Sequence, residues 1–368
     1  MNALNTVYVD NSATTQISRE VWDEIRRTKN HYGNPSSSHL MGQNSKKLIE
    51  ISRNRIAKVI NAKPNEIIFT SCGTESNNTA LNVKGHIITS TIEHSSVLNA
   101  VKNKDTTYIP VDRHGLIDIN ILKSSFKENT EIVSIMFANN EIGTIQNIKQ
   151  ISKICRAHGV KFHTDAVQAI GHKKIDVDEY GIDLMSISGH KLYAPKGIGV
   201  LYVRNGIDIN PLLFGGGQEF SLRSGTENIN GIIGIGKAFE LLKYRNNIYI
   251  DSLKNKLIKG LYNTVPNISL NSTGDLPNIV NITFKGINNK LMLKALSANG
   301  IYASGGSACS AGGNKPSHVL LAIGLSEKDA NSSVRFSFGL YNTEYDVNYM
   351  LHVIPPIVKW LRNQAVNG

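Results

Sequence analysis

Short apolar runs separated by longer amphipathic stretches dominate the chain between about residue 55 and residue 240. The runs are typical of β-strands and cover residues 66–71, 86–90, 107–111, 132–138, 160–165, 184–188 and 199–203. Helical patterns lie between several of them, as at residues 147–158, where Ile148, Ile151 and Ile154 recur at helical spacing. Strands that alternate with helices predict a mostly parallel sheet covered by helices on both faces, which is an α/β fold.

The pattern changes after Gly231. A long helical stretch covers residues 232–245, and a second amphipathic one continues to Tyr262. The C-terminal third then mixes predicted strands with predicted helices, at residues 278–284, 289–299, 333–337 and 345–362. This mixture predicts a smaller α+β domain. We therefore expect a large domain over residues 15–245 and a small domain made of residues 1–14 and 246–368.

Composition limits the class of protein. Hydrophobic residues make up 40% of the chain and charged residues 19%, as in ordinary globular proteins. No apolar run approaches the ~18 residues of a membrane span, so we expect no integral membrane protein. The N-terminus lacks the basic and apolar halves of a secretion signal. Three widely spaced cysteines, an odd number, suit a reducing compartment, and we expect a cytoplasmic protein.

The chain is basic, with a formal net charge of +11. Such a charge is compatible with an acidic partner or with nucleic acid. The lysines and arginines are scattered, however, and no run of five or more occurs. A generally basic surface with local anion sites is therefore the favoured interpretation, and direct nucleic-acid binding stays open.

Lys191 is the first candidate for chemistry. An apolar strand at residues 183–187 delivers it into a turn of small residues, and a second apolar strand follows at 198–203. A lysine placed this way can lie beside a flat cofactor and form an imine with its aldehyde. The alternative is a surface lysine in a β-turn.

A second candidate is the segment around Gly73 and Thr74, which is typical of a strand, a tight turn and the start of a helix. Gly73 lets the backbone approach a ligand, Thr74 offers a hydroxyl, and the helix start attracts phosphate. The alternative is an ordinary capped helix.

Two further candidates stand at predicted strand ends. Asp165 ends the strand 160–165, where ligands of open α/β sheets bind, and its carboxylate can pair with a protonated pyridine nitrogen. Gln168 follows three residues later and can donate a hydrogen bond to a ring oxygen. His94 follows another strand and can stack on an aromatic cofactor and move protons. Alone, Asp165 is more often a helix cap and His94 a structural histidine.

Two loops add polar groups. Asn139 and Asn140 follow a predicted buried strand, where amides need partners. Three consecutive glycines at 215–217 precede Arg223, Ser224 and Thr226, a mixture that suits an anion, with a flexible linker as the alternative.

Taken together, these segments resemble the pyridoxal-phosphate cysteine desulfurases of the NifS/IscS type, in the class V aminotransferase group of fold-type I enzymes. The resemblance runs nearly end to end and includes the segments 8–14, 32–37, 304–312 and 333–339. It implies a fold-type I transferase with a seven-stranded large domain. It also implies that the chain is a homodimer that takes L-cysteine, releases L-alanine and passes sulfur to an acceptor protein.

The resemblance assigns roles to the candidates. Lys191 would be the Schiff-base lysine, His94 would stack on the ring, Asp165 would meet the pyridine nitrogen and Gln168 the ring oxygen. The phosphate would be held by Gly73, Thr74, Ser188 and His190. Thr226 would reach the same phosphate from the partner subunit. The substrate carboxylate would be bound by Asn140 and Arg335 with help from Asn34. No metal is expected.

Cys309 decides the subtype. It stands in a loop at about 304–314 with Gly305, Gly306, Gly312 and Gly313 nearby, which indicates a segment free to swing. The alternative for an isolated cysteine is a small buried hydrophobe. The reactive interpretation is favoured, and the loop length resembles the long-loop, IscS-like group. Cys309 would then carry the persulfide sulfur.

Three features depart from the family pattern. Gln218 stands where many relatives carry histidine, and Cys72 replaces the commoner glycine in the phosphate turn, where packing rather than catalysis is expected. The chain also ends soon after the helix 345–362, without the longer tail with which IscS-like relatives dock their iron–sulfur scaffold. The acceptor is therefore left open among iron–sulfur assembly, thio-modification and DNA phosphorothioation.

Two other functions stay as alternatives. A selenocysteine lyase or a related class V aminotransferase would keep Lys191 and Asp165 but need no mobile cysteine. A non-catalytic subunit that binds partners or DNA is disfavoured by the intact lysine.

Overall fold

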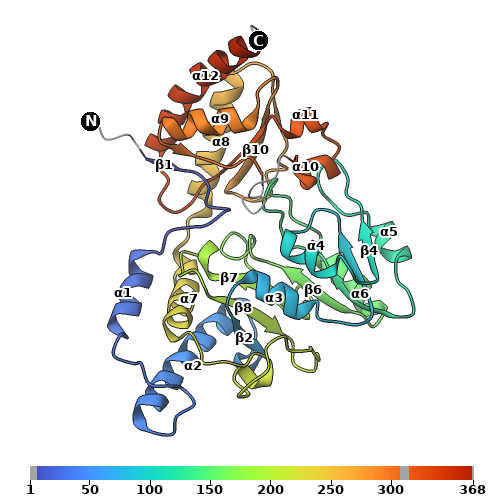
Figure 1. Ribbon diagram of the computed structural model, residues 1–368, viewed down its shortest axis with the longest axis vertical. Coiled ribbons are helices and arrows are strands. Elements are labelled where there is room, and N and C mark those ends of the chain that lie inside the picture. Colours follow the sequence, from blue (N-terminus) through green and yellow to red (C-terminus); the bar gives the residue numbers. More distant parts are fainter. Residues whose placement is uncertain (1–5, 307–314, 367–368) are drawn as a thin grey trace.

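The structure is a computed structural model that describes residues 6–306 and 315–366 of the chain (Figure 1). Two parts lie one above the other in this view, with both ends of the chain in the upper part. The lower part contains the large sheet, and the upper part contains the smaller sheets and the long C-terminal helix.

The large sheet has seven strands within the described residues. In spatial order they are β2 (Ile67–Thr70), β8 (Gly199–Val203), β7 (Leu184–Ser188), β6 (Lys161–Asp165), β5 (Thr130–Ser134), β3 (His86–Ser90) and β4 (Thr106–Ile109). Strand β8 runs antiparallel to both of its neighbours, whereas the remaining pairs are parallel. The predicted seven-stranded, mostly parallel sheet is confirmed.

Burial explains why these segments form strands. Every residue of β2, β3, β7 and β8 is buried, so these strands read as continuous runs rather than alternating ones. Strands covered on both faces by helices have this composition.

Helices cover both faces of the sheet. Helix α7 (Ile229–Leu241) packs against α1 (Arg19–Arg27) and α2 (Leu40–Ile60), and α3 (Gly73–Ala80) packs against β2, β6, β7 and β8. The other helices of this part are α4 (Ser95–Val101), α5 (Ile119–Ser124) and α6 (Ile148–Ala157). Short 3₁₀ turns are η1 (Pro64–Glu66), η2 (Gly189–Lys191), η3 (Glu219–Ser221) and η4 (Leu242–Tyr244).

The upper part is built on an antiparallel sheet, in which β10 (Ile279–Phe284) lies between β9 (Ile268–Leu270) and β12 (Ser333–Ser337). A parallel pair joins β1 (Val7–Tyr8) to β11 (Ile301–Tyr302). Its helices are α8 (Asn247–Thr264), α9 (Asn289–Ala298), α10 (His318–Ala322), α11 (Glu327–Ala330) and α12 (Glu344–Val366).

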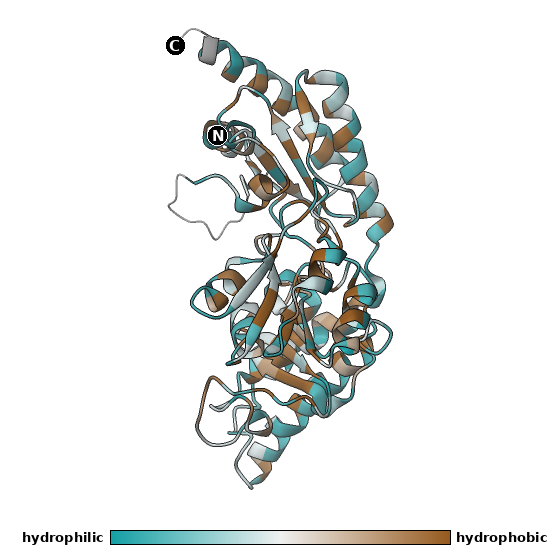
Figure 2. Ribbon diagram, turned by 90° about the vertical axis from the view of Figure 1, so that its right-hand side faces the viewer, coloured by the Kyte–Doolittle hydropathy of each residue, from teal (hydrophilic) through white to brown (hydrophobic). Residues whose placement is uncertain are grey.

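Two large hydrophobic clusters follow this arrangement. One extends from Val21 to Phe239 with additions from Leu276 and Ile279, and the other joins Val7 and Val9 to residues between Ile250 and Leu361. Figure 2 shows hydrophobic segments along the strands inside both parts. The exact division of the chain at residues 14/15 and 245/246 stays a prediction.

The predicted elements differ from the observed ones mainly at their ends. The apolar run 132–138 forms a strand only to Ser134. Phe137 still donates its N–H to the Asp165 carbonyl of β6, but its own carbonyl accepts from the Gln146 N–H, and Asn139 donates to the Thr144 carbonyl of the following turn. Helix α7 begins at Ile229, earlier than the apolar pattern indicated, because the Asn228 side chain caps it by accepting a hydrogen bond from the Gly231 N–H. Among the described helices, none is both long and apolar enough to cross a bilayer.

Candidate active site

A cavity of about 150 Å³ opens at the carboxyl edge of the large sheet. Ten residues predicted from the sequence line it, namely Gly73, Thr74, His94, Asn140, Asp165, Gln168, Ser188, His190, Lys191 and Arg335. Parallel strands end at one edge, so residues that follow different strands meet there. Asp165 is the last residue of β6 and Ser188 the last of β7. The sequence-predicted site thus comes together in one place.

Lys191 is positioned by the turn η2 and by the N-terminal segment at residues 10–15. Its Nζ donates hydrogen bonds to the carbonyl oxygens of Ser12 and Ala13, the latter at 2.6 Å. Thr15 in turn donates its backbone N–H to the His190 carbonyl at 2.9 Å. The N-terminal segment therefore holds the lysine at the mouth of the cavity.

Asp165 and His94 are joined through Asn77 of helix α3. The Asn77 amide nitrogen donates to Asp165 Oδ2 at 2.7 Å and to Ser96 Oγ at 2.8 Å. Ser96 Oγ lies 2.8 Å from His94 Nδ1, and because this hydroxyl already accepts from Asn77 its own proton points to the imidazole. The backbone N–H of Val167 gives Asp165 a further hydrogen bond at 3.0 Å. Two hydrogen-bond donors thus fix the Asp165 carboxylate, and the Ser96 hydroxyl connects Asn77 to the His94 imidazole.

His94 is neutral with a defined tautomer. Burial lowers its pKa below the ordinary value, and the neighbouring charge of Asp165 opposes that change. Nδ1 accepts a hydrogen bond from the Ser96 backbone N–H at 3.2 Å, so the ring proton resides on Nε2. His94 lines the same cavity as Lys191 and carries its ring proton on Nε2.

The start of α3 forms a cradle for an anion. A Cβ added at Gly73 would lie 3.0 Å from Val167 Cγ2, a tight contact, so glycine leaves room here for a ligand to approach the backbone. Ser188 Oγ is buried and has no hydrogen-bond partner among the described residues. Cys72 precedes the helix and also lines the cavity, half-buried. Helix N–H groups and a hydroxyl in need of a partner suit a phosphate.

His190 borders the same region and is neutral. Burial, together with the charges of Lys191 and Lys196, lowers its pKa to about 4. Its Nδ1 lies 3.1 Å from Thr14 Oγ1. Gln168 donates to the Ser12 carbonyl at 3.0 Å, so its amide is oriented by the same N-terminal segment that holds Lys191.

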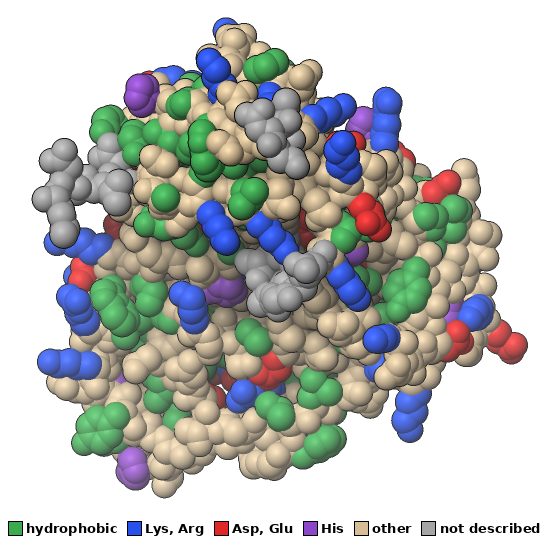
Figure 3. All heavy atoms as spheres, turned by 45° about the horizontal axis from the view of Figure 1, so that its top comes forward, with side chains coloured by type: hydrophobic (Ala, Val, Ile, Leu, Met, Phe, Trp, Pro, Cys, Tyr) green, Lys and Arg blue, Asp and Glu red, His purple; other side chains and the backbone are tan. Residues whose placement is uncertain are grey.

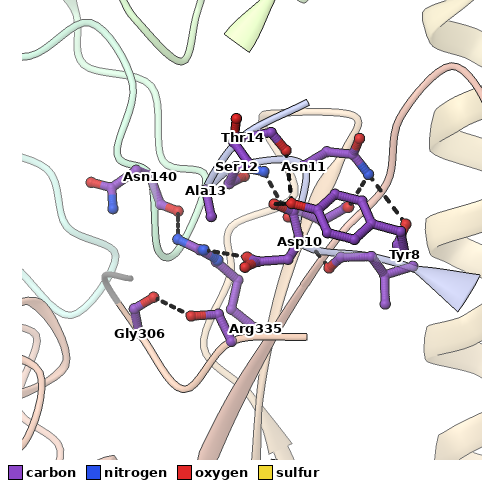
Figure 4. A network of polar contacts seen from close by, with 12 residues as sticks. Tyr8, Asp10, Asn11, Ser12, Ala13, Thr14, Asn140, Gly306 and Arg335 are labelled. Atoms are coloured by element: carbon purple, nitrogen blue, oxygen red, sulfur yellow. Dashed lines mark hydrogen bonds and ion pairs between the residues drawn. The ribbon is translucent and has the colours of Figure 1, made fainter. Parts of the chain in front are cut away.

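Arg335 reaches the cavity from β12 of the upper part. Its side chain is almost fully buried, and its Nη2 forms an ion pair with Asp10 Oδ1 at 2.7 Å. Nη1 donates to the Asn140 carbonyl at 2.8 Å (Figure 4). Nε has no hydrogen-bond partner among the described residues. A fixed guanidinium with an available donor suits a carboxylate.

Three predicted residues do not line this cavity. Thr226 is exposed and borders a separate cavity of about 100 Å³ with Arg223, Gly225 and Ser71. Asn34 is exposed in the loop before α2, where its side chain accepts from the Ser36 N–H at 2.9 Å. Cys309 lies outside the described residues.

The sequence reasoning missed several residues of the site. Asn77 carried a signal, because it stands four residues after Gly73 and therefore on the same face of α3. Asp10 and the Ser12 carbonyl carried none, since their partners Arg335 and Lys191 are far away along the chain. Gln218, the departure in the glycine loop, accepts a hydrogen bond from the Gly225 N–H at 2.9 Å and so belongs to the segment of Thr226.

On the face of the molecule seen in Figure 3, lysine and arginine side chains are spread over the surface and do not gather into one basic patch. The residues described in the structure contain no group of three or more histidine, cysteine, aspartate or glutamate side chains arranged to hold a metal ion.

Known proteins resemble the chain closely. The family model described as aminotransferase class-V matches residues 7–350. A protein of Clostridium botulinum named cysteine desulfurase IscS is 44% identical over 98% of this chain and 96% of its own length. The solved structure titled "NIFS-LIKE PROTEIN" superposes with a TM-score of 0.90 at 37% identity, over 97% of this chain and 100% of that one. The structure titled "SspA in complex with cysteine" has a TM-score of 0.82 at 36% identity, over 92% of this chain and 100% of that one.

These matches extend over nearly the whole chain and over nearly the whole of each relative. They confirm the resemblance drawn from the motifs and the fold expected from it. The chain belongs to the class-V aminotransferase family.

Proposed function

We propose that this chain is a pyridoxal-phosphate-dependent cysteine desulfurase, which converts L-cysteine to L-alanine and passes the sulfur through a persulfide on Cys309 to an acceptor protein. The observation that carries the proposal is the single cavity lined by Lys191, Asp165, His94 and Arg335. The names of the full-length relatives agree with it.

The residues of the cavity fit the cofactor. The cradle at Gly73 and the unpartnered Ser188 hydroxyl suit its phosphate, with Thr74 and His190 beside them. Asp165, held by Asn77 and Val167, suits a protonated ring nitrogen, and Gln168, which lines the same cavity, would serve the ring oxygen. When bound, pyridoxal phosphate supplies an aldehyde for amines and a ring that withdraws electrons from the attached substrate carbon.

Arg335 binds the substrate carboxylate. Asp10 and the Asn140 carbonyl hold two of its nitrogens, which fixes the plane of the guanidinium. The Nε donor of Arg335, which has no partner among the described residues, would form a charge-assisted hydrogen bond with the substrate carboxylate. Asn140 completes this end of the cavity, and Asn34 is proposed to join it in the assembled enzyme.

Lys191 and His94 handle the protons. Lys191 holds the cofactor before substrate arrives, and its Nζ then takes the proton from the substrate α-carbon. His94 carries its proton on Nε2, and burial keeps the ring from taking up a second one near neutral pH. Asp165, which is held by Asn77 and the Val167 N–H, would pair with the protonated ring nitrogen.

Cys309 receives the sulfur. Its thiolate attacks the substrate sulfur, a sulfur–sulfur bond forms, and the carbon–sulfur bond of the substrate breaks with its electron pair left on carbon. Protonation of that carbon, together with return of a proton from Lys191 to the α-carbon, gives alanine. The persulfide on Cys309 then passes its outer sulfur to a thiol or another nucleophile of the acceptor. The acceptor class stays open among iron–sulfur assembly, thio-modification and DNA phosphorothioation.

We also propose a homodimer in which Thr226 serves the partner's phosphate site, and a cytoplasmic location. Thr226 is exposed at the surface of a single chain, as a residue that serves another subunit must be. The described cysteines, Cys72 and Cys155, are unpaired, which suits a reducing compartment. A selenocysteine lyase or transaminase is not favoured, because the full-length relatives carry the name cysteine desulfurase.

The test measures alanine formed from L-cysteine by wild type and by Cys309→Ala. We expect turnover to fall at least a hundredfold in Cys309→Ala while the visible cofactor absorbance is kept. Cys155→Ala is the control, because this thiol is buried and burial raises its pKa to about 12. Undiminished alanine production by Cys309→Ala would remove the persulfide route, and a wild type that binds no cofactor would remove the proposal.

A further inference from the structure

A second, much smaller cavity lies on the other side of Lys191. Its volume is about 10 Å³, roughly the space that one buried water occupies. Its lining includes Lys191 with Tyr193, His172, Arg245 and Asn278. Lys191 thus borders both the large pocket and this cavity.

Arg245 is an unusual neighbour for the lysine. Its Nε and Nη1 are buried and have no hydrogen-bond partner among the described residues, and no ion pair within those residues involves it. Desolvation lowers its pKa, and the Tyr193 hydroxyl offsets part of that effect through its charge and a side-chain hydrogen bond. The Tyr193 ring centroid lies 5.2 Å from the Arg245 Cζ. Such a buried cation is costly, so its presence calls for a physical reason.

The backbone is shaped to receive this guanidinium. Gly171 has a φ of +84°, and a Cβ there would lie only 2.1 Å from Arg245 Nη1. Asn247 secures the same turn by donating to the Gly171 carbonyl at 3.0 Å. The glycine at position 171 and the Asn247 hydrogen bond thus leave a space that the Arg245 guanidinium fills.

The cavity also presents an acceptor. Asn278 Oδ1 is buried without a hydrogen-bond partner among the described residues. A donor on Arg245 and an acceptor on Asn278, both at a water-sized cavity, are the partners that one ordered water satisfies. The guanidinium is thereby kept in place without a carboxylate to cancel its charge.

We infer that Arg245 is a positioning residue for Lys191, and that its uncompensated positive charge behind the lysine lowers the proton affinity of the Nζ amine. A lysine must lose its proton before it can act as a nucleophile or base, and a nearby cation favours that loss.

The other groups around Lys191 do not duplicate this effect. On the side of the large pocket lie Asp165, whose negative charge acts in the opposite sense, Arg335, and the histidines His94 and His190. On the side of Arg245 lie Tyr193 and His172, and burial together with Arg245 lowers the pKa of His172 well below its ordinary value. His172 is therefore neutral at working pH, and Arg245 supplies the permanent positive charge on this side.

The test uses cofactor-free protein, so that it stands apart from the proposed function except in taking Lys191 as the reacting amine. The rate at which Lys191 is acylated by acetic anhydride is followed by mass spectrometry across a pH series, which gives the pKa of its amine. We expect Arg245→Met to raise the proton affinity of Lys191 at least threefold, a pKa increase of about 0.5.

Arg362→Met is the matched control, because it removes the same charge from α12, where Arg362 donates to the carbonyl oxygens of Lys285, Pro266 and Asn267. We expect it to leave the Lys191 pKa unchanged. A folded Arg245→Met protein with the wild-type pKa would overturn the inference, as would an equal increase in Arg362→Met.

A second variant keeps the inference testable if Arg245→Met does not fold. Gly171→Ala retains the arginine but pushes its guanidinium away from the cavity, so the pKa of Lys191 should rise in the same direction. No rise in a folded Gly171→Ala protein would contradict the role of Arg245. If neither protein binds cofactor normally while the pKa rises, the inference stands and only the proposed function is affected.

Discussion

At the scale of single residues, Asn77 links the two groups that surround the proposed cofactor. One amide nitrogen serves both Asp165 and, through Ser96, His94. Because both hydrogens of that nitrogen are used, the orientation of the carboxylate and that of the imidazole depend on the same side chain. Asn77 acts through Asp165 and Ser96 and is a positioning residue.

Replacement of Asn77 by alanine should therefore cost more than an ordinary hydrogen bond. It removes a donor to a charged carboxylate, a loss of about 1.5–3 kcal/mol, which corresponds to roughly a tenfold to hundredfold decrease in kcat/KM for cysteine. Asn65→Ala is the control, because Asn65 bonds only to Asn205 at an exposed site. The measurement is the kcat/KM for cysteine of both variants. Equal values would show that Asn77 does not position Asp165 and His94.

Glu93 makes stability depend on pH. It is fully buried, and desolvation raises its pKa to about 8, although Ser90 and the Met136 N–H bond to it. The unfolded chain releases this proton near its ordinary pKa of 4.5, whereas the folded chain keeps it until about pH 8. Folding stability contributed by this group is therefore present below pH 4.5 and is lost as pH rises to 8, by at most about 5 kcal/mol.

Removal of the titrating group should abolish this loss. In urea titrations, the free energy of unfolding of Glu93→Gln relative to wild type should increase steadily between pH 5 and pH 8. Glu128→Gln, at an exposed position, serves as control and should show a constant difference. A constant difference for Glu93→Gln as well would mean that the carboxyl is not protonated in the folded protein.

At the scale of elements, the sequence pattern predicted all seven strands of the described large sheet. The pattern is clearest for strands buried on both faces, such as β7 and β8, which are simple apolar runs, and weakest for the edge strand β4. Strand ends were harder. The run 132–138 stays buried beyond Ser134, but the Phe137 carbonyl and the Asn139 N–H bond to the turn at residues 144–146, and a hydrophobicity pattern does not record this change of partner. The strand-end rule brought Asp165 and His94 to the same cavity, because a residue that follows a parallel strand lies at the carboxyl edge even when the strand end is one or two residues off.

The glycine loop is anchored by a buried ion pair between elements. Arg53 of α2 bonds Glu219 of η3 with both terminal nitrogens, at 2.9 and 2.7 Å, and both side chains are nearly fully buried. Glu219, Phe220 and Ser221 all have positive φ, a conformation that non-glycine residues adopt only when held. This anchor fixes the segment that leads to Thr226.

Loss of one partner should be costly here. Arg53→Met leaves the Glu219 charge buried and unpaired, and we expect thermal or urea unfolding to show a loss of about 3–5 kcal/mol. The double variant Arg53→Met/Glu219→Gln should recover part of that loss. Lys127→Ala, which breaks the half-exposed pair with Asp105, should cost no more than about 1 kcal/mol. Equal losses from the buried and the exposed pair would contradict this account.

At the scale of the whole molecule, the site is assembled from both parts of the chain. Asp10 and Arg335 form their ion pair across 325 residues, and the carbonyl oxygens of Ser12 and Ala13 hold Lys191 across 179 and 178 residues. No local pattern could predict these contacts, because they depend on how the upper sheet sits on the lower one. Arg335 itself was found only through the family motif around it.

The proposed homodimer makes a prediction of its own. Thr226 does not reach the Lys191 cavity of its own chain, so Thr226→Ala should weaken cofactor binding through the partner's site, by roughly tenfold for one hydrogen bond to a charged phosphate. Thr264→Ala is the control, because its side chain bonds only to the Gly260 carbonyl within α8.

Mixed dimers sharpen this prediction. When Lys191→Ala chains are exchanged with Thr226→Ala chains, one site of each mixed dimer contains an intact Lys191 and an intact Thr226 from the other subunit. A fraction of sites with wild-type affinity should therefore appear in cofactor titrations. Failure to regain any such sites in proven mixed dimers would place Thr226 outside the partner's site.

The attachment of the cofactor to Lys191 is the claim on which the whole account depends. The direct measurement is reduction of the cofactor-loaded protein with borohydride, followed by proteolysis and mass spectrometry of the peptides. We predict the mass of reduced pyridoxal phosphate on the peptide that contains Lys191, and on no peptide when the protein is Lys191→Ala. The same mass on another lysine, or on none, would contradict the account.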